Sequence, residues 1–232
     1  MPPANATTRW NIISQPLTRS GFAPYGDVIE NPIAHHVNSI PSDLPSSPVP
    51  FILANQNTAL KASPVSSMQN KYHESLTKRI GEPVMSMFAC FPRELDPDAA
   101  GKSIFRVRIL ERHPFTTQTF IPMGLSPDDP STKYLVIVAP TLPSEQQTPQ
   151  KGPPDLQNLR AFVAHGRQAV TYGAGTWHAP MVVVGEKRID FVVVQSVNGV
   201  SEDDCQEVEI EQEGVSVSFP LKERRSTGAA KL

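Results

Sequence analysis

The sequence predicts a mainly β protein, either a closed barrel or two stacked sheets, with a few short helices. Three observations support this prediction. About ten short runs rich in β-branched and aromatic residues are spread along the chain. Proline, glycine and aspartate close most of these runs. Outside two short segments, no stretch keeps the 3.6-residue apolar period of an amphipathic helix.

The first candidate element is a short helical turn within SQPLTRSGFAPYGDVIE, where Ser14 or Thr18 can cap the start and Pro24 and Gly26 end it. A second short helix is predicted within QNKYHESLTKRI. The predicted strands then follow in chain order: VMSMFACF, IFRVRILERH, TTQTFIPM, YLVIVAP, LRAFVAH, QAVTY, MVVVG, RIDFVVVQSV, EVEI and VSVSF.

Two proline- and serine-rich segments, about residues 31–50 and 139–154, are poor in apolar residues. We therefore expect them to form long surface loops. The simplest organisation is a single domain over residues 1–219, followed by a flexible tail over residues 220–232.

Composition excludes several classes of protein. The 21 basic and 23 acidic residues nearly balance, whereas a nucleic-acid-binding protein usually has a basic surplus. The chain has two cysteines, Cys90 and Cys205, with no CxxC spacing, which fits a reducing compartment and no disulfide framework. No stretch reaches the roughly 18 apolar residues of a membrane span, and the first ten residues lack the apolar segment of a secretion signal. We expect a protein that binds neither nucleic acid nor membrane and is not secreted.

The chain ends in Ala230-Lys231-Leu232. This tripeptide differs by one small residue from the Ser-Lys-Leu signal that a peroxisomal import receptor recognises. The expected location is the peroxisome, through that receptor, or else the cytoplasm.

Alternation along IFRVRILERH predicts one face with Phe105, Val107, Ile109, Glu111 and His113 and an outward face that includes Arg112. Glu111 and His113 would then extend the inward apolar row. A charged group that faces the core costs several kcal/mol unless it is paired or neutralised. Gln118 follows on the next strand, two residues before Phe120. We therefore expect a polar site at this end of the core.

The turn-rich stretch TYGAGTWHAP places His178 at the start of another strand. Its Gly-x-x-His spacing resembles the second motif of the cupin fold, and Glu111-x-His113, Gln118 and Gly124 resemble an altered first motif. The implied metal ligands are Glu111, His113, Gln118 and His178. This set is less charged than the usual cupin set, so we expect no tightly held metal, although it could hold Ni, Mn or Zn.

Several segments together resemble the ureidoglycolate lyase family, formerly called ureidoglycolate hydrolases. The segments are APYGDVIE, LERHPFTTQTFIPM, LRAF, VTYGAGTWHAPM and DF followed by DDCQEVEI. The resemblance spans about residues 10–210 and implies a cupin-like β-barrel that forms a homodimer. It also implies cleavage of (S)-ureidoglycolate to glyoxylate and urea in the breakdown of allantoin, a product of purine catabolism.

Elimination of urea needs a base for the substrate hydroxyl and an acid for the departing nitrogen, and imidazoles suit both tasks near neutral pH. We assign His113 and His178 as the acid/base pair, with Glu111 either orienting His113 or binding a metal. Gln118 would bind the substrate hydroxyl or ureido carbonyl. Tyr172 and Trp177 would form the pocket wall, and Arg160 would hold the substrate carboxylate. No cofactor is required by this chemistry.

Two other functions remain open from the sequence. An amidohydrolase acting on the same substrate would release ammonia, and it would normally need a water activated by a metal ion. A cupin that only binds a small acid would tolerate loss of Glu111 and His113.

Overall fold

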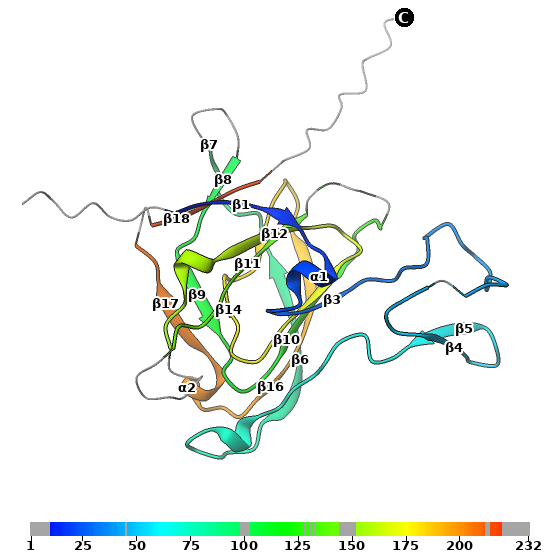
Figure 1. The fold of residues 1–232 in the computed structure, drawn as a ribbon, viewed down its shortest axis with the longest axis horizontal. Coiled ribbons are helices and arrows are strands. Elements are labelled where there is room, and N and C mark those ends of the chain that lie inside the picture. Colours follow the sequence, from blue (N-terminus) through cyan, green and yellow to red (C-terminus); the bar gives the residue numbers. More distant parts are fainter. Residues whose placement is uncertain are drawn as a thin grey trace, which may run out of the picture.

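The computed structural model describes residues 10–44, 46–97, 103–127, 129, 131, 133–143, 152–211 and 214–219. The predicted tail over residues 220–232, with its terminal tripeptide, lies outside them, as does the middle of the predicted loop over residues 139–154. The mainly β prediction is confirmed, because the described strands form three larger sheets and one separate hairpin (Figure 1).

A seven-stranded sheet is central to the fold. Its order is β17-β9-β14-β11-β12-β2, and β15 pairs with another part of β11. The strands are β2 (Gln15–Pro16), β9 (Ile109–Arg112), β11 (Tyr134–Ala139), β12 (Arg160–Ala164), β14 (Trp177–His178), β15 (Val182–Val183) and β17 (Gln206–Glu209).

Two further sheets pack on the central one. The five-stranded sheet has the order β3-β13-β10-β16-β6 and the four-stranded sheet the order β1-β18-β8-β7. Strands of the five-stranded sheet are β3 (Gly26–Ile29), β6 (Glu82–Cys90), β10 (Gln118–Met123), β13 (Ala169–Tyr172) and β16 (Ile189–Val197). Those of the four-stranded sheet are β1 (Trp10–Ile13), β7 (Asp96–Pro97), β8 (Ser103–Arg106) and β18 (Val215–Ser218).

Helices are few and short, as expected. Helix α1 (Arg19–Phe22) begins after Thr18, whose hydroxyl accepts a hydrogen bond from Gly21 N at 3.1 Å. The other elements are the 3₁₀ turns η1 (Tyr72–Glu74) and η3 (Leu156–Asn158) and the helix α2 (Ser201–Asp204). Within the described residues, no helix has the length and apolar character that a membrane crossing would need.

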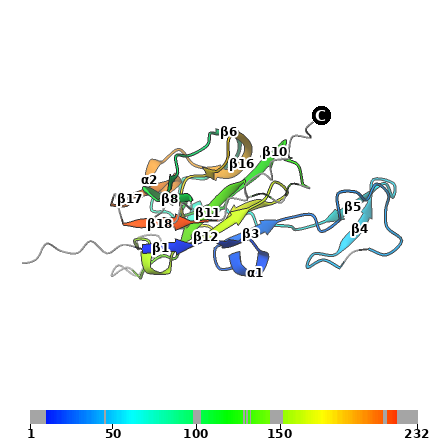
Figure 2. The same cartoon turned by 90° about the horizontal axis from the view of Figure 1, so that it is seen from above.

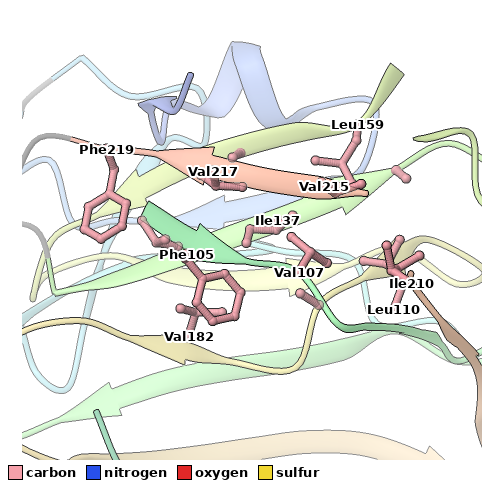
Figure 3. Packing of buried hydrophobic residues seen from close by; sticks show 14 of the residues in the cluster. Phe105, Val107, Leu110, Ile137, Leu159, Val182, Ile210, Val215, Val217 and Phe219 are labelled. Atoms are coloured by element: carbon pink, nitrogen blue, oxygen red, sulfur yellow. The ribbon is translucent and has the colours of Figure 1, made fainter. Parts of the chain in front are cut away.

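Strand β11 explains how the layers are held together. All six of its residues are buried. Leu135, Ile137 and Ala139 belong to a core between the seven- and four-stranded sheets, together with Phe105, Val215 and Val217. Figure 3 shows Ile137 among the residues of this core. The alternate residues, Tyr134, Val136 and Val138, belong to a second core against the five-stranded sheet. Successive strand residues point to opposite faces, so one apolar strand serves both cores.

The prediction of one continuous strand over IFRVRILERH is wrong. The chain leaves the four-stranded sheet after Arg106 and enters the seven-stranded sheet at Ile109. At the crossing, Val107 N donates to Val215 O and Ile210 N donates to Arg108 O. Val107 and Leu110 both point into the first core although they are three residues apart, so the two-residue period is broken there.

This break reverses the predicted faces of β9. Leu110 and Arg112 point into the first core, and Arg112, predicted to face outward, is only 2% exposed. Glu111 lies on the other face of β9, which is the face turned toward the five-stranded sheet. Alternation predicted that Glu111 shares a face with Phe105 and Val107. In the structure those two residues point into the first core, and Glu111 points to the opposite side of the sheet.

One hairpin stands apart from the three larger sheets. Strands β4 (Phe51–Ala54) and β5 (Ala59–Ala62) pair only with each other, and both ribbon views place them well away from the larger sheets (Figures 1 and 2). Their turn contains Asn55, Gln56 and Asn57, all with positive φ. The described residues before it, 31–44 and 46–50, contain no helix or strand.

Candidate active site

Two strands of the central sheet bring the acidic residue and one histidine together. Glu111 on β9 is the direct antiparallel partner of His178 on β14. Directly opposed residues of an antiparallel pair project from the same face of the sheet. The turn before β14 bends at Gly175, whose φ of +81° favours glycine, and Gly175 N donates to His113 O at 2.8 Å. That contact ties His113, just beyond the end of β9, to the turn that leads to His178.

The three side chains form a compact buried cluster. His113 and His178 are 6% and 1% exposed, and their ring centres are 5.5 Å apart. His178 Nε2 lies 3.5 Å from Glu111 Oε1. This distance is at the outer limit of a hydrogen bond, so we treat the contact as an electrostatic pairing. We refer to Glu111, His113 and His178 as the Glu-His-His cluster.

Backbone carbonyls fix the orientation of both imidazoles. His113 Nδ1 lies 2.6 Å from Asp204 O, and His178 Nδ1 lies 2.9 Å from Thr176 O. A carbonyl oxygen can only accept, so each Nδ1 must carry the proton. In the neutral ring each Nε2 then holds a lone pair, and both Nε2 atoms are buried without a hydrogen-bond partner among the described residues.

Gln118 adds a further acceptor from the five-stranded sheet. It lies beside His113, and its Oε1 is also buried without a partner in the described part of the chain. Its amide nitrogen donates to Gln195 Oε1 at 2.6 Å. Two imidazole lone pairs, a carboxylate and an amide oxygen therefore meet with no donor between them. Such a site suits a ligand that brings protons, such as a hydroxyl with N–H groups, or a cation.

Burial and mutual charge set the protonation of the cluster. Burial, followed by the charge of His178, lowers the pKa of His113, and the Asp204 carbonyl, Glu111 and Gln118 oppose this only in part. For Glu111, burial raises the pKa, but the pairing with His178 and the charge of His113 outweigh it, so the net shift is downward. At neutral pH the carboxylate is therefore ionised and His113 is neutral.

Tyr172, which the sequence analysis placed in the pocket wall, lies against the Glu-His-His cluster. Its ring stacks on His178 with a centroid distance of 4.0 Å and an interplanar angle of 10°. It is also the direct strand partner of Gln118. Burial raises the pKa of Tyr172 well above its ordinary value, so the phenol stays neutral.

Two other predicted residues are not brought to the cluster. Trp177 precedes His178 on β14 and points into the first core, where Arg112 lies over its ring at 4.4 Å. Arg160 is exposed and donates to Leu159 O, and no hydrogen bond or ion pair in the described structure links it to the cluster. It shares a sheet face with His178, because both are direct partners of Val138 in β11.

Sequence reasoning missed the residues that support the cluster. Asp204 supplies the carbonyl for His113, and its carboxylate accepts from Tyr72 OH at 2.7 Å and Asn198 N at 2.8 Å. Gln195 holds the amide of Gln118. The one available signal was the polar Gln195 at the end of the apolar run FVVV; nothing in the sequence distinguishes Asp204 from its acidic neighbours.

The cluster also has the composition of a metal site. Ligand atoms of Glu111, His113 and His178 all lie within 4.8 Å of one another, so the group could hold a metal ion. Glu111 forms a second such group with Cys205 and Glu207. Burial and nearby carboxylates raise the pKa of Cys205 to about 12, which makes its protonated thiol a poor ligand.

Comparison with known proteins gives one consistent result. The ureidoglycolate lyase family model matches residues 9–218. The chain is 38% identical over 195 residues to a ureidoglycolate lyase of Schizosaccharomyces pombe, covering 84% of this chain and 89% of the relative. For the enzyme of the same name from Saccharomyces cerevisiae the identity is 36% over 191 residues, covering 79% and 84%. For that of Burkholderia mallei it is 32% over 180 residues, covering 78% and 79%.

Proposed function

The chain belongs to the ureidoglycolate lyase family, and we propose that it cleaves ureidoglycolate to glyoxylate and urea at the Glu-His-His cluster. The resemblance identified in the sequence is thereby confirmed. The chain is a carbon–nitrogen lyase of allantoin and purine degradation. The observation that carries the assignment of the site is the meeting of four acceptor groups, three of them buried and without a hydrogen-bond partner among the described residues.

The chemistry of the substrate matches those acceptors. One carbon of ureidoglycolate bears a hydroxyl, a carboxylate and a urea nitrogen. When the O–H proton leaves, the carbon–oxygen double bond forms and the carbon–nitrogen bond breaks. The departing nitrogen then takes a proton and becomes part of urea. The reaction therefore needs a proton acceptor within hydrogen-bond reach of the hydroxyl and a proton donor within reach of the nitrogen on the same carbon.

His113 is the base in this proposal. Its lowered pKa keeps it neutral near pH 7, and its Nδ1–H bond to Asp204 O directs the Nε2 lone pair into the site. His178 is the acid, because its Nε2 lies 3.5 Å from Glu111 Oε1 and the two groups can share the proton that the departing nitrogen takes. Glu111 is thus paired with His178, whereas the sequence analysis had it either orient His113 or bind a metal.

A divalent ion is an alternative occupant of the same site. Glu111, His113 and His178 would hold it, with Gln118 Oε1 as a neighbouring oxygen. Nickel, manganese or zinc suits a set of imidazole and oxygen ligands, and a bound ion would polarise the substrate hydroxyl. The elimination itself requires only the two proton transfers, so we propose that it proceeds without a metal.

Identification of the nitrogen product tests the function. Purified protein is treated with a chelator and supplied with ureidoglycolate, and urea, ammonia and glyoxylate are measured. Urea in equal amount to glyoxylate is the expected result. Ammonia would indicate an amidohydrolase instead. Product that forms only after a divalent ion is restored would make the Glu-His-His cluster a metal centre, and no product under either condition would contradict the function.

The proposal also includes a homodimer formed through the outer face of the five-stranded sheet. Met87, Val192 and Ile121 are aligned partners across β6, β16 and β10, and they share the face turned away from the core. Exposed apolar side chains on this face include Met85 (73%), Met87 (60%) and Met123 (49%). A contiguous apolar area of this kind on a sheet is typical of an interface.

Light scattering tests this part of the proposal. Met87→Glu places a charge in the middle of the apolar face and is expected to convert a wild-type dimer to a monomer. Leu76→Glu is the matched control, since Leu76 is 90% exposed and lies in the loop after η1. A wild-type monomer, or a Met87→Glu protein that remains dimeric, would contradict the interface.

A further inference from the structure

Gln195 is a polar residue on a mostly apolar strand, and its side chain is hydrogen-bonded to Gln118. It ends the apolar run of β16, and it is the direct strand partner of Gln118 on β10. Opposed residues of an antiparallel pair share a face, so both amides point toward the Glu-His-His cluster rather than toward the outer apolar face. On its other side Gln118 is aligned with Tyr172, whose ring covers His178. Gln118 is thus held between a wall of the site and a second amide.

The hydrogen bond between the two amides determines what Gln118 offers to a ligand. Gln118 Nε2 donates to Gln195 Oε1 at 2.6 Å. The carbonyl end of the same amide, Oε1, must then point the other way, toward His113. That oxygen is buried and has no hydrogen-bond partner among the described residues. A buried acceptor without a donor costs about as much as a lost hydrogen bond, so a ligand with an N–H group gains by filling it.

We propose that Gln195 is a positioning residue that orients the amide of Gln118, so that Gln118 Oε1 accepts a hydrogen bond from the ureido group of the substrate. This inference rests on the proposed function, because it assigns a partner to one part of ureidoglycolate. The N–H donors of the substrate all belong to its ureido group, and the rest of the molecule has none. Gln118 Oε1 therefore recognises the half of the substrate that leaves as urea, and His113 acts on the half that becomes glyoxylate.

The two products of the reaction report on the two halves of the site separately. Urea contains the ureido N–H groups without the carboxylate, and glyoxylate contains the carboxylate without the ureido group. Inhibition of wild-type turnover by each product measures how well each half is bound. A change at the Gln118–Gln195 pair should alter inhibition by urea and leave inhibition by glyoxylate unchanged.

Two substitutions of Gln195 separate positioning from simple packing. Gln195→Met keeps the side-chain volume but removes the acceptor, so the Gln118 amide loses its fixed orientation. Gln195→Glu keeps an acceptor at the same place and cannot donate, so it holds Gln118 Nε2 at least as firmly. If the pair were oriented the other way, with Gln195 donating to Gln118 Oε1, the glutamate would be the more damaging change. Gln69→Met, at a half-buried glutamine in the loop beside Thr117, is the matched control.

The expected result has three parts. In Gln195→Met the inhibition constant of urea and the KM of ureidoglycolate rise about tenfold, as expected for one hydrogen bond in a buried site, while the inhibition constant of glyoxylate stays the same. In Gln195→Glu both values for urea and substrate stay within about threefold of wild type. Gln69→Met behaves like wild type.

Other outcomes overturn the inference. Equal loss of urea and glyoxylate binding in Gln195→Met would indicate a general structural role. A greater loss in Gln195→Glu than in Gln195→Met would indicate the reverse amide orientation, and absence of inhibition by urea in the wild type would mean that the ureido group is not bound here. If wild-type protein releases no urea from ureidoglycolate, the proposed function itself fails, and that result is obtained before any Gln195 variant is made.

Discussion

Replacement of either active-site histidine is expected to reduce the rate of glyoxylate and urea formation by at least about 100-fold, because each contributes one proton transfer. His113→Ala and His178→Ala remove the imidazoles entirely. His113→Asn and His178→Asn are gentler, since an asparagine amide can still donate to Asp204 O or Thr176 O but has no counterpart of Nε2. The asparagine variants should therefore stay folded and still be inactive.

Replacement of a histidine outside the Glu-His-His cluster is the matched control. His73 is strongly exposed, with 76% of its side chain accessible, and its Nε2 lies 3.7 Å from Oε1 of the neighbouring Glu74. His73→Ala should keep wild-type turnover. Initial rates are measured for all variants together with thermal unfolding. Near-normal turnover in the folded His113 and His178 variants would contradict the assignment of the acid/base pair.

Loss of the buried arginine is expected to lower the free energy of unfolding by roughly 2–4 kcal/mol. Arg112 lies over the Trp177 ring at 4.4 Å and donates through Nε to Gln206 Oε1 at 2.9 Å. Burial lowers its pKa to about 10, so the guanidinium is still charged at neutral pH. Arg112→Ala would leave a void against Trp177 and an unpaired amide oxygen on Gln206. Unfolding is followed in guanidinium chloride, since urea is a reaction product.

Arg106→Ala is the control for this measurement. Arg106 is on β8, the strand that precedes β9 along the chain. It forms an ion pair with Asp96 at 2.6 Å, but both side chains are well exposed. Exposed ion pairs contribute at most about 1 kcal/mol. Similar losses in Arg112→Ala and Arg106→Ala would contradict the structural role given to Arg112. Arg112→Lys should recover little, because a lysine lacks the planar group that stacks on the indole.

Local features of the sequence were sufficient to predict the fold class and to single out two histidines that the structure brings together. Strand propensity and turn residues predicted the mainly β fold, and Thr18, one of the two cap residues that the sequence offered, caps a short helix. The spacing around His113 and His178 singled out both histidines before any geometry was known. These predictions depend on residues that are close in sequence, where propensity and alternation apply directly.

The features that the sequence could not supply depend on distant contacts. Strands β1 and β18 pair in parallel although Trp10 and Val215 lie at opposite ends of the chain. The face reversal between β8 and β9 arises where the chain passes from one sheet to another, which alternation alone cannot reveal. Asp204 and Gln195 act through partners 91 and 77 positions away, so only the folded structure identifies them. The β4–β5 hairpin was missed, although FILA and ALKA flank a polar turn.

The pH dependence of kcat/KM in chelator-treated protein tests the central claim, which is that a neutral His113 removes the substrate proton. This parameter reports the pKa of groups in the free protein. Burial and the charge of His178 lower the pKa of His113, so activity should be lost on the acid side with a midpoint below the ordinary histidine value of about 6.5. The negative charge of Glu111 opposes that shift. In Glu111→Gln the midpoint should therefore move to still lower pH, whereas an acid-side midpoint above about 6.5, or one that rises in Glu111→Gln, would contradict the account.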